Sequence, residues 1–188
     1  EVIIEPHKRL SVLKQDHFAY DENKVVETVI MGNKRLYEIM QEKERLYAKE
    51  DFNDEDGILL GELEGEFAEL NGWEAESEAS SLLQGLGIGT DAHYKLMSEL
   101  TGAEKVKVLL AQALFGNPGI LILDEPTNHL DMESITALNE GMAKFKGIIL
   151  FTSHDHQLTQ TVANRIIDIK ADKVVDREVT YNEYLGME

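Results

Sequence analysis

The sequence predicts an α/β domain, in which a parallel sheet forms the core and a helical part is attached to it. Two observations predict this fold. The stretches Ile120–Leu123 and Ile148–Phe151 are unbroken apolar runs, each of which ends in polar residues. Such runs are typical of parallel strands that are buried on both faces. Residues 23–86 instead carry apolar side chains three and four positions apart, the spacing of amphipathic helices.

Composition limits the functions that this segment can have. The chain has 188 residues, enough for one domain with a small appended part, and 43% of them are hydrophobic. No apolar run approaches the ~20 residues that cross a bilayer, and no signal peptide is visible, so we expect no membrane contact. The absence of cysteine is compatible with a reducing cytosol. A net charge of −18 argues against direct nucleic-acid binding by this segment.

Two neighbouring acids follow the first apolar run. Pro126 cannot continue a strand ladder, so the chain turns there and leaves Asp124 and Glu125 at the carboxyl end of the predicted strand. Open α/β sheets bind ligands at that edge. Adjacent carboxylates suit a divalent cation and a water molecule that loses its proton. The alternative is a strand followed by an acidic turn with no ligand.

The stretch from Gly119 to Asp131 resembles the Walker B motif and D-loop of ABC-type ATPases. Its second half, 126–131 (Pro-Thr-Asn-His-Leu-Asp), resembles the ABC-F family of cytosolic proteins, which have two ATPase domains in one chain. The resemblance implies ATP and Mg²⁺ as cofactors, with Asp124 holding Mg²⁺ through water and Glu125 orienting or deprotonating the attacking water. It also implies a P-loop NTPase-like parallel sheet core, here incomplete, with an α-helical ABC subdomain and a helical insertion.

Residues 1–22 are expected to be the Q-loop part of the ATPase core. Glu1–Ile4 and Leu10–Leu13 are predicted to be short strands around a Pro6-His7 turn, and the abrupt start suggests an internal piece of a longer protein. Gln15 follows the second strand. By resemblance it is the glutamine that touches Mg²⁺ and the hydrolytic water, although an exposed loop residue has the same local sequence.

Residues 23–99 are expected to form the helical subdomain with an arm-like insertion. The stretches 36–47, 59–70 and 73–83 are predicted to be helices. In some ABC-F proteins such an insertion is an arm that reaches the ribosome. The alternative, which we favour from the sequence, is an amphipathic hairpin that packs on its own domain. The acidic stretch 51–56 has the composition of a cation loop but lacks the glycine and final glutamate of an EF-hand, which favours a solvated turn.

Residues 100–188 are expected to complete the ATPase core. The stretch Leu100-Thr101-Gly102-Ala103-Glu104 lies where the ABC signature Leu-Ser-Gly-Gly-Gln/Glu is expected, and Thr101 with Glu104 predicts a capped helix start. By resemblance these five residues bind the γ-phosphate of ATP held by the opposite domain, using helix N–H groups and a free hydroxyl. The methyl of Thr101 and the Cβ of Ala103 predict a weakened signature. The alternative is a capped helix without ligand.

A helix is predicted after Asp131, which is a plausible N-cap and the D-loop aspartate by resemblance. The strand 147–152 follows it. His154 then matches the switch histidine that contacts the γ-phosphate, a role that a neutral imidazole can fill by donating one N–H. His129 falls in the D-loop, where domain contact is expected. The remainder predicts a helix at 157–163, a hairpin at 165–176 and a short last helix capped by Thr180 and Glu183.

No phosphate-binding loop of the form Gly-x-x-x-x-Gly-Lys-Ser/Thr occurs in the sequence. We therefore expect this chain to be a fragment of an ABC-F ATPase, inactive alone, whose parent hydrolyses ATP in the cytoplasm. The expected partners are the second ATPase domain of the same parent chain and, by family resemblance only, the ribosome in a translation or antibiotic-resistance role. Two alternatives remain: a non-catalytic interaction module, or a Walker B-bearing module of another P-loop family.

Overall fold

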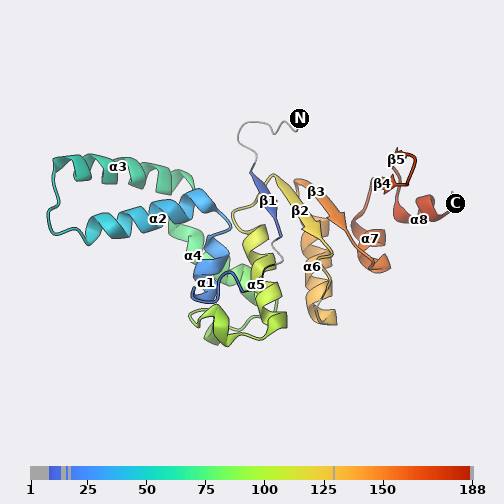
Figure 1. Cartoon of the computed structure of the whole chain (residues 1–188), viewed down its shortest axis with the longest axis horizontal. Helices are drawn as coiled ribbons and strands as arrows, with labels where there is room; N and C mark the ends of the chain where they lie inside the picture. The colour runs from blue at the N-terminus through green and yellow to red at the C-terminus, as the bar shows by residue number, and fades with distance from the viewer. Residues whose placement is uncertain (1–8, 14–15, 17, 129, 187–188) are drawn as a thin grey trace.

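The computed structural model of the chain describes residues 9–13, 16, 18–128 and 130–186. A small sheet stands at the centre, with a helical region that ends in a long hairpin on one side and the C-terminal elements on the other (Figure 1). The predicted strand Glu1–Ile4 and residue Gln15 lie outside the described residues.

Three strands form the central sheet: β1 (Leu10–Val12), β2 (Ile120–Asp124) and β3 (Ile148–Thr152). Both pairings are parallel, and β2 lies in the middle. The long connection from β1 to β2 holds the helical region, and the connection from β2 to β3 holds α6 (Met132–Lys144). The parallel pairing agrees with the strands predicted from the two apolar runs.

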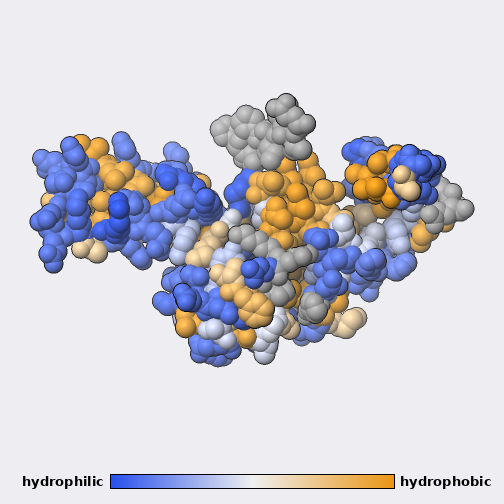
Figure 2. Space-filling model, viewed as in Figure 1, coloured by the Kyte–Doolittle hydropathy of each residue, from blue (hydrophilic) through white to orange (hydrophobic). Residues whose placement is uncertain are grey.

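In the part of the chain that the structure describes, one face of the sheet is buried and the other is half-buried or exposed, which differs from the expectation that β2 is covered on both sides. Leu121 and Leu123 are 0% and 1% exposed and join Leu138 and Met142 of α6 in the core. On the other face, the register aligns alternate residues of the strands, and these are half-buried or exposed: Leu10, Val12, Ile120, Ile122, Ile148 and Leu150. Figure 2 shows an apolar patch over this part of the sheet. Among the described residues no layer covers it.

The helical region is built around α5 (Gly102–Leu114), most of whose side chains are buried. It packs against α1 (Val25–Ile30) and α4 (Ala75–Gly85) and also contacts β1. Apolar residues thus surround α5 on several sides, which explains why its sequence is nearly continuous in Val, Leu and Ala. The helix joins the sheet and the helical region into one hydrophobic core.

A hairpin of two helices, α2 (Lys34–Tyr47) and α3 (Asp54–Glu69), extends from this region. It projects away from the sheet, and its tip at 48–53 is the far end of the molecule in Figure 1. The two helices pack on each other and are bridged by the ion pairs Arg35–Glu66 and Lys43–Glu64, and Lys49 of the tip pairs with Asp56 of α3. The hairpin is therefore an arm that packs on itself, not a hairpin that lies along its own domain.

The acidic stretch 51–56 divides between the tip of the hairpin and α3: residues 54–56 form the first turn of the helix, and Asn53 is its N-cap. Asn53 caps the helix by accepting a hydrogen bond from the Asp56 N–H, and Asp56 accepts one in return from the Asn53 N–H, both at 3.0 Å. Lys49 and the Asn53 N–H hold the pKa of Asp56 below its ordinary value. The capping box accounts for Asp56, so the acids here stabilise a helix start.

Short 3-10 turns surround the helical region at Gly72–Glu74, Thr90–Ala92 and Met97–Glu99. After β3 the chain forms α7 (His156–Val162), an antiparallel hairpin of β4 (Ile166–Ile169) and β5 (Val174–Arg177), and α8 (Tyr181–Leu185). Thr180 and Glu183 form the predicted capping box. The third predicted helix, at 73–83, starts later and ends later in the structure: α4 runs from Ala75 to Gly85, and Gly87, at φ +77°, follows its C-cap Leu86.

A substitution of Gly32, which follows α1, can test how closely α1 packs on α5. A Cβ at this position would lie 2.0 Å from the backbone oxygen of Gln112, which cannot move without displacing α5. We expect Gly32→Ala to lower the free energy of unfolding by about 2 kcal/mol, the typical cost of overpacking, measured by urea denaturation. Gly61→Ala is the matched control, because nothing lies within 4 Å of its Cβ position in α3. It should instead raise stability by about 1 kcal/mol.

Candidate functional site

The candidate site is built on the carboxyl ends of β2 and β3. The register pairs Asp124, the last residue of β2, with Thr152, the last residue of β3. The Thr152 hydroxyl donates to Asp124 Oδ1 at 2.5 Å and accepts from the Glu125 N–H at 3.1 Å. The Glu125 N–H also points to the Thr152 carbonyl at 3.1 Å. One threonine therefore fixes both neighbouring acids at the edge of the sheet.

Glu125 has a left-handed backbone, with φ +45°. For a residue other than glycine or asparagine this conformation is uncommon and costs about 1–3 kcal/mol. It is held by Thr152 on one side and by the Asn128 N–H, which donates to the Glu125 carbonyl at 3.1 Å, on the other. Strain of this kind concentrates at functional sites, where the surrounding structure enforces it.

His154 lies beside Glu125. Its Nε2 is 3.4 Å from Glu125 Oε1, and its backbone N–H donates to Glu125 Oε2 at 3.3 Å. The imidazole is 98% exposed, whereas the Glu125 side chain is 23% exposed. The acid is thus partly shielded and held on two sides, while the histidine faces the space beyond the sheet. This places the predicted base and the predicted switch histidine next to each other; their catalytic roles stay predictions.

The signature stretch is a tightly capped helix start. Leu100 is buried, and Thr101, Gly102 and Ala103 are exposed before α5 turns inward. The Thr101 N–H and hydroxyl both donate to Glu104 Oε2, at 2.8 and 2.7 Å, and the hydroxyl accepts from the Glu104 N–H. The two hydrogen bonds that Thr101 donates lower the pKa of Glu104, and the bond from the backbone N–H has the larger effect. The expectation of a free hydroxyl is therefore wrong, because the capping box engages it.

Asp131 connects the turn after β2 to α5. Its carboxylate Oδ2 lies 2.8 Å from Lys107 Nζ, and its carbonyl accepts from the Ile135 N–H in α6 at 2.9 Å. The signature stretch and the predicted D-loop aspartate are therefore linked through a lysine that the sequence analysis did not single out. Gln15 and His129, the other residues predicted for this region, lie outside the described residues.

The donor set suits Mg²⁺ only in part. Asp124 is an exposed carboxylate at the strand end, the kind of oxygen ligand that Mg²⁺ uses with waters and substrate phosphates. In the described part of the chain, no group of three or more His, Asp or Glu residues could hold a metal by itself. The residues thus fit a Mg²⁺ ion that shares its coordination with nucleotide phosphates and water, and do not form a protein-only cage.

Sequence reasoning missed Thr152 and Lys107 as parts of the site. A signal existed for Thr152: it ends the strand beside β2, so parallel pairing brings its hydroxyl to the carboxylates. Lys107 could have been noticed as a charge within the apolar sequence of α5, where it is 8% exposed and needs a partner. Nothing local in the sequence indicates that this partner is Asp131, because 24 residues separate them.

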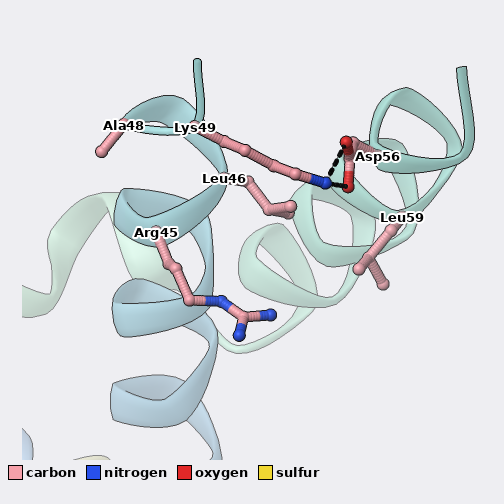
Figure 3. A pocket seen from close by; sticks show the side chains of 6 residues that line it. All are labelled: Arg45, Leu46, Ala48, Lys49, Asp56 and Leu59. Atoms are coloured by element: carbon pink, nitrogen blue, oxygen red, sulfur yellow. Dashed lines mark hydrogen bonds and ion pairs between the residues drawn. The ribbon is translucent and has the colours of Figure 1, made fainter. Parts of the chain in front are cut away.

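A pocket of about 530 Å³ lies elsewhere, at the outer end of the arm. Arg45, Leu46, Ala48, Lys49, Asp56 and Leu59 line it, and Lys49 reaches across it from the connection after α2 to Asp56 on α3 (Figure 3). The arm separates this pocket from the strand ends (Figure 1). It is therefore a hollow between the two arm helices and no part of the candidate site.

A parallel sheet with a helical region between its first two strands, and acids followed by a histidine at the strand ends, defines the class of protein as an ATP-binding cassette domain. The profile of the ABC transporter family matches residues 2–128, and the chain belongs to this family. The expected α/β, P-loop NTPase-like fold is confirmed by solved structures. In the described residues, no helix is long and apolar enough to cross a membrane.

The relatives found by sequence are ABC-F family ATP-binding proteins. The chain is 58% identical over 93% of its length to the "Uncharacterized ABC transporter ATP-binding protein YkpA" of Bacillus subtilis (strain 168). It is 40% identical over 98% of its length to the "Probable ATP-binding protein YbiT" of Escherichia coli O157:H7. The "ABC transporter F family member 4" of Arabidopsis thaliana is 30% identical. The chain spans 32% and 35% of the first two relatives, about a third of their length.

A solved ATP-binding cassette, MJ0796, in a dimeric post-hydrolysis state bound to ADP and Pi, has the same fold with a TM-score of 0.61. The match covers 92% of this chain and 63% of that one at 17% identity. A second dimeric structure of the same cassette matches equally. At this identity the likeness establishes the fold.

The left-handed backbone of Glu125 can be tested through stability. Asparagine tolerates this conformation better than glutamate, so we expect Glu125→Asn to raise the free energy of unfolding by about 1 kcal/mol in urea denaturation. Glu125→Gln, which keeps the side-chain length and the strain, should leave stability within about 0.5 kcal/mol of the original. A destabilised Asn variant would contradict the strain at this position.

Proposed function

We propose that this chain is the Walker B and signature part of an ABC-F ATPase domain, which hydrolyses ATP when a phosphate-binding loop and a second ATPase domain complete the site. One observation carries the proposal: Glu125, strained and anchored by Thr152, has its carboxylate 3.4 Å from His154 Nε2 at the ends of two adjacent parallel strands. The family relationship supports the same activity.

The residues have distinct tasks in this proposal. Glu125 accepts the proton of the attacking water or orients it, which its partial shielding and fixed position favour. His154 donates a ring N–H to the γ-phosphate from its exposed position. Asp124, with one oxygen held by Thr152, would hold Mg²⁺ through water, and the ion would supply positive charge to the phosphates. Gln15 is proposed to approach the same ion.

Part of the phosphate cradle is proposed to come from a segment outside these 188 residues, because the sequence contains no Gly-x-x-x-x-Gly-Lys-Ser/Thr loop. Residues 100–104 are proposed to serve the nucleotide held by the second ATPase domain. Their anion contacts have to come from the exposed N–H groups at the start of α5, because the Thr101 hydroxyl already bonds Glu104. This supports a signature that binds the γ-phosphate weakly.

The cellular process is proposed from the ABC-F resemblance: action on the ribosome in the cytoplasm. The projecting arm α2–α3 supports contact with a large partner, since its tip stands well away from the sheet (Figure 1). The arm helix α3 carries acids and no Lys or Arg, so contact with RNA phosphates through this helix is disfavoured.

Glu125→Gln in the full-length protein tests the activity. Removal of the base should lower kcat for ATP hydrolysis by about 100-fold or more, measured by phosphate release, while ATP still binds. Glu133→Gln is the matched control, because Glu133 is exposed in the first turn of α6 and lies outside the proposed site. Turnover retained in the Glu125 variant would remove that residue from its role.

Co-sedimentation tests the partner. The Glu125→Gln protein should pellet with ribosomes in an ATP-dependent manner, because unhydrolysed ATP keeps the two domains closed. Replacement of residues 36–67 by a short Gly/Ser linker should weaken pelleting at least about tenfold without lowering basal ATP hydrolysis, since the arm packs mainly on itself. Co-sedimentation that changes neither with ATP nor with replacement of the arm would argue against the ribosome as the specific partner.

The runner-up function is a non-catalytic interaction module, favoured by the absence of the phosphate-binding loop from the sequence. Calorimetry of this chain with Mg-ATP measures whether the chain alone binds ATP, which bears on the choice between an ATPase domain and an interaction module. We expect negligible heat, because no lysine-bearing loop can hold the phosphates. Tight ATP binding by the chain alone would show that its own residues suffice and would overturn the assignment of the phosphate cradle to another segment.

A further inference from the structure

Two lysines are buried near the start of α5, in a helix that is otherwise almost wholly apolar. Lys105 and Lys107 are 5% and 8% exposed. A buried ammonium is costly unless a carboxylate pairs with it, so each lysine must have a specific partner. Each finds that partner on a loop that leaves the sheet, one after β1 and the other after β2.

Lys105 reaches the loop after β1. Its Nζ forms an ion pair with Asp21 and lies 4.9 Å from the centre of the Phe18 ring. These contacts hold the first turn of α5 against that loop independently of Lys107. The placement of the helix therefore does not depend on a single ion pair.

Lys107 reaches the turn after β2. Its Nζ lies 2.8 Å from Asp131 Oδ2, and its side chain is 10% exposed against 58% for Asp131. Gly87, just past the carboxyl end of α4, lies against the same ammonium, since a Cβ added there would be 3.7 Å from Nζ. A helix carboxyl end favours a cation, so the lysine is fixed from two sides. The buried lysine is the anchor, and the exposed aspartate is the group that it holds.

Asp131 is joined to Glu125 by a compact turn. The Asn128 N–H donates to the Glu125 carbonyl at 3.1 Å, and the Leu130 N–H donates to the Thr127 carbonyl at 3.2 Å. Glu125 is thus bonded to Asn128, and Thr127 to Leu130, the residue that directly precedes Asp131.

We propose that Lys107 is a positioning residue, which holds Asp131 and the turn behind it at a fixed place relative to the signature stretch. The inference rests on the proposed ATPase function and adds a residue to it. Its consequence is that the start of α5 and the turn after β2 act as one body, so that the γ-phosphate contact at 100–104 and the base Glu125 move together.

The test is steady-state ATP hydrolysis by the full-length protein. Lys107→Ala should lower kcat about tenfold with the KM for ATP changed less than about twofold, because the base is misplaced while nucleotide contacts remain. Lys107→Arg should restore at least half of the rate, since a guanidinium can reach the same carboxylate. The double variant Lys107→Ala/Asp131→Asn should be no slower than the slower single variant, because both remove one interaction.

Lys43→Ala is the matched control. Lys43 has an equally buried side chain, 10% exposed, and pairs with Glu64 at 2.9 Å, but it lies in the arm. It should lower the thermal midpoint as Lys107→Ala does and leave kcat unchanged. The positioning role is overturned if Lys107→Ala has the same kcat as Lys43→Ala. It is also overturned if the loss of kcat in the double variant equals the combined losses of the Lys107→Ala and Asp131→Asn single variants.

Two variants keep this result separate from the proposed function. A wild-type protein that hydrolyses ATP and a Glu125→Gln protein that does not would uphold the ATPase proposal whatever Lys107 does. Absence of hydrolysis in the wild type, or turnover in Glu125→Gln, would overturn the ATPase proposal and with it the role of Lys107 in that reaction.

Discussion

The pairing of Asp124 with Thr152 is the contact on which the candidate site depends. Parallel register places the last residues of β2 and β3 side by side, and the threonine hydroxyl then serves both acids: it donates to Asp124 and accepts from the Glu125 N–H. A hydroxyl can do both at once, which valine, of the same shape, cannot. The left-handed turn at Glu125 follows, and it brings the carboxylate to His154. A one-residue slip of β3 would remove all of these contacts together.

Helix α5 carries the second constraint. It is buried on most of its surface, yet it places two ammonium groups inside the protein, each matched by a carboxylate from a different loop. Buried ion pairs contribute little net stability compared with apolar packing, but they define position, because a displaced partner leaves an uncompensated charge. The helix therefore fixes where the loops after β1 and β2 lie relative to the signature stretch, and apolar contacts alone would fix this less sharply.

The sequence alone predicted the features that are local. The apolar runs predicted β2 and β3, and the capping boxes at Thr101 and Thr180 predicted two helix starts that the structure confirms. The misses need knowledge of distant residues. Burial of β2 on both faces was wrong because periodicity does not reveal what covers a strand. The hairpin was expected to pack on its own domain. An amphipathic stripe shows that a helix packs against another surface but does not identify that surface, and here the two helices pack against each other. The partner of Lys107 lies 24 residues away, beyond any local pattern.

The open face of the sheet has a consequence for handling the protein. Branched aliphatic side chains of β1, β2 and β3 stand there in register and meet water. At pH 7 the net charge of −18 makes copies of the chain repel one another. That repulsion vanishes near the isoelectric point, about pH 4.6, whereas the exposed apolar face of the sheet stays the same. Charge repulsion therefore opposes aggregation through the exposed apolar face of the sheet. Mild acid weakens this repulsion by lowering the net charge, and high salt weakens it by screening, so both favour aggregation.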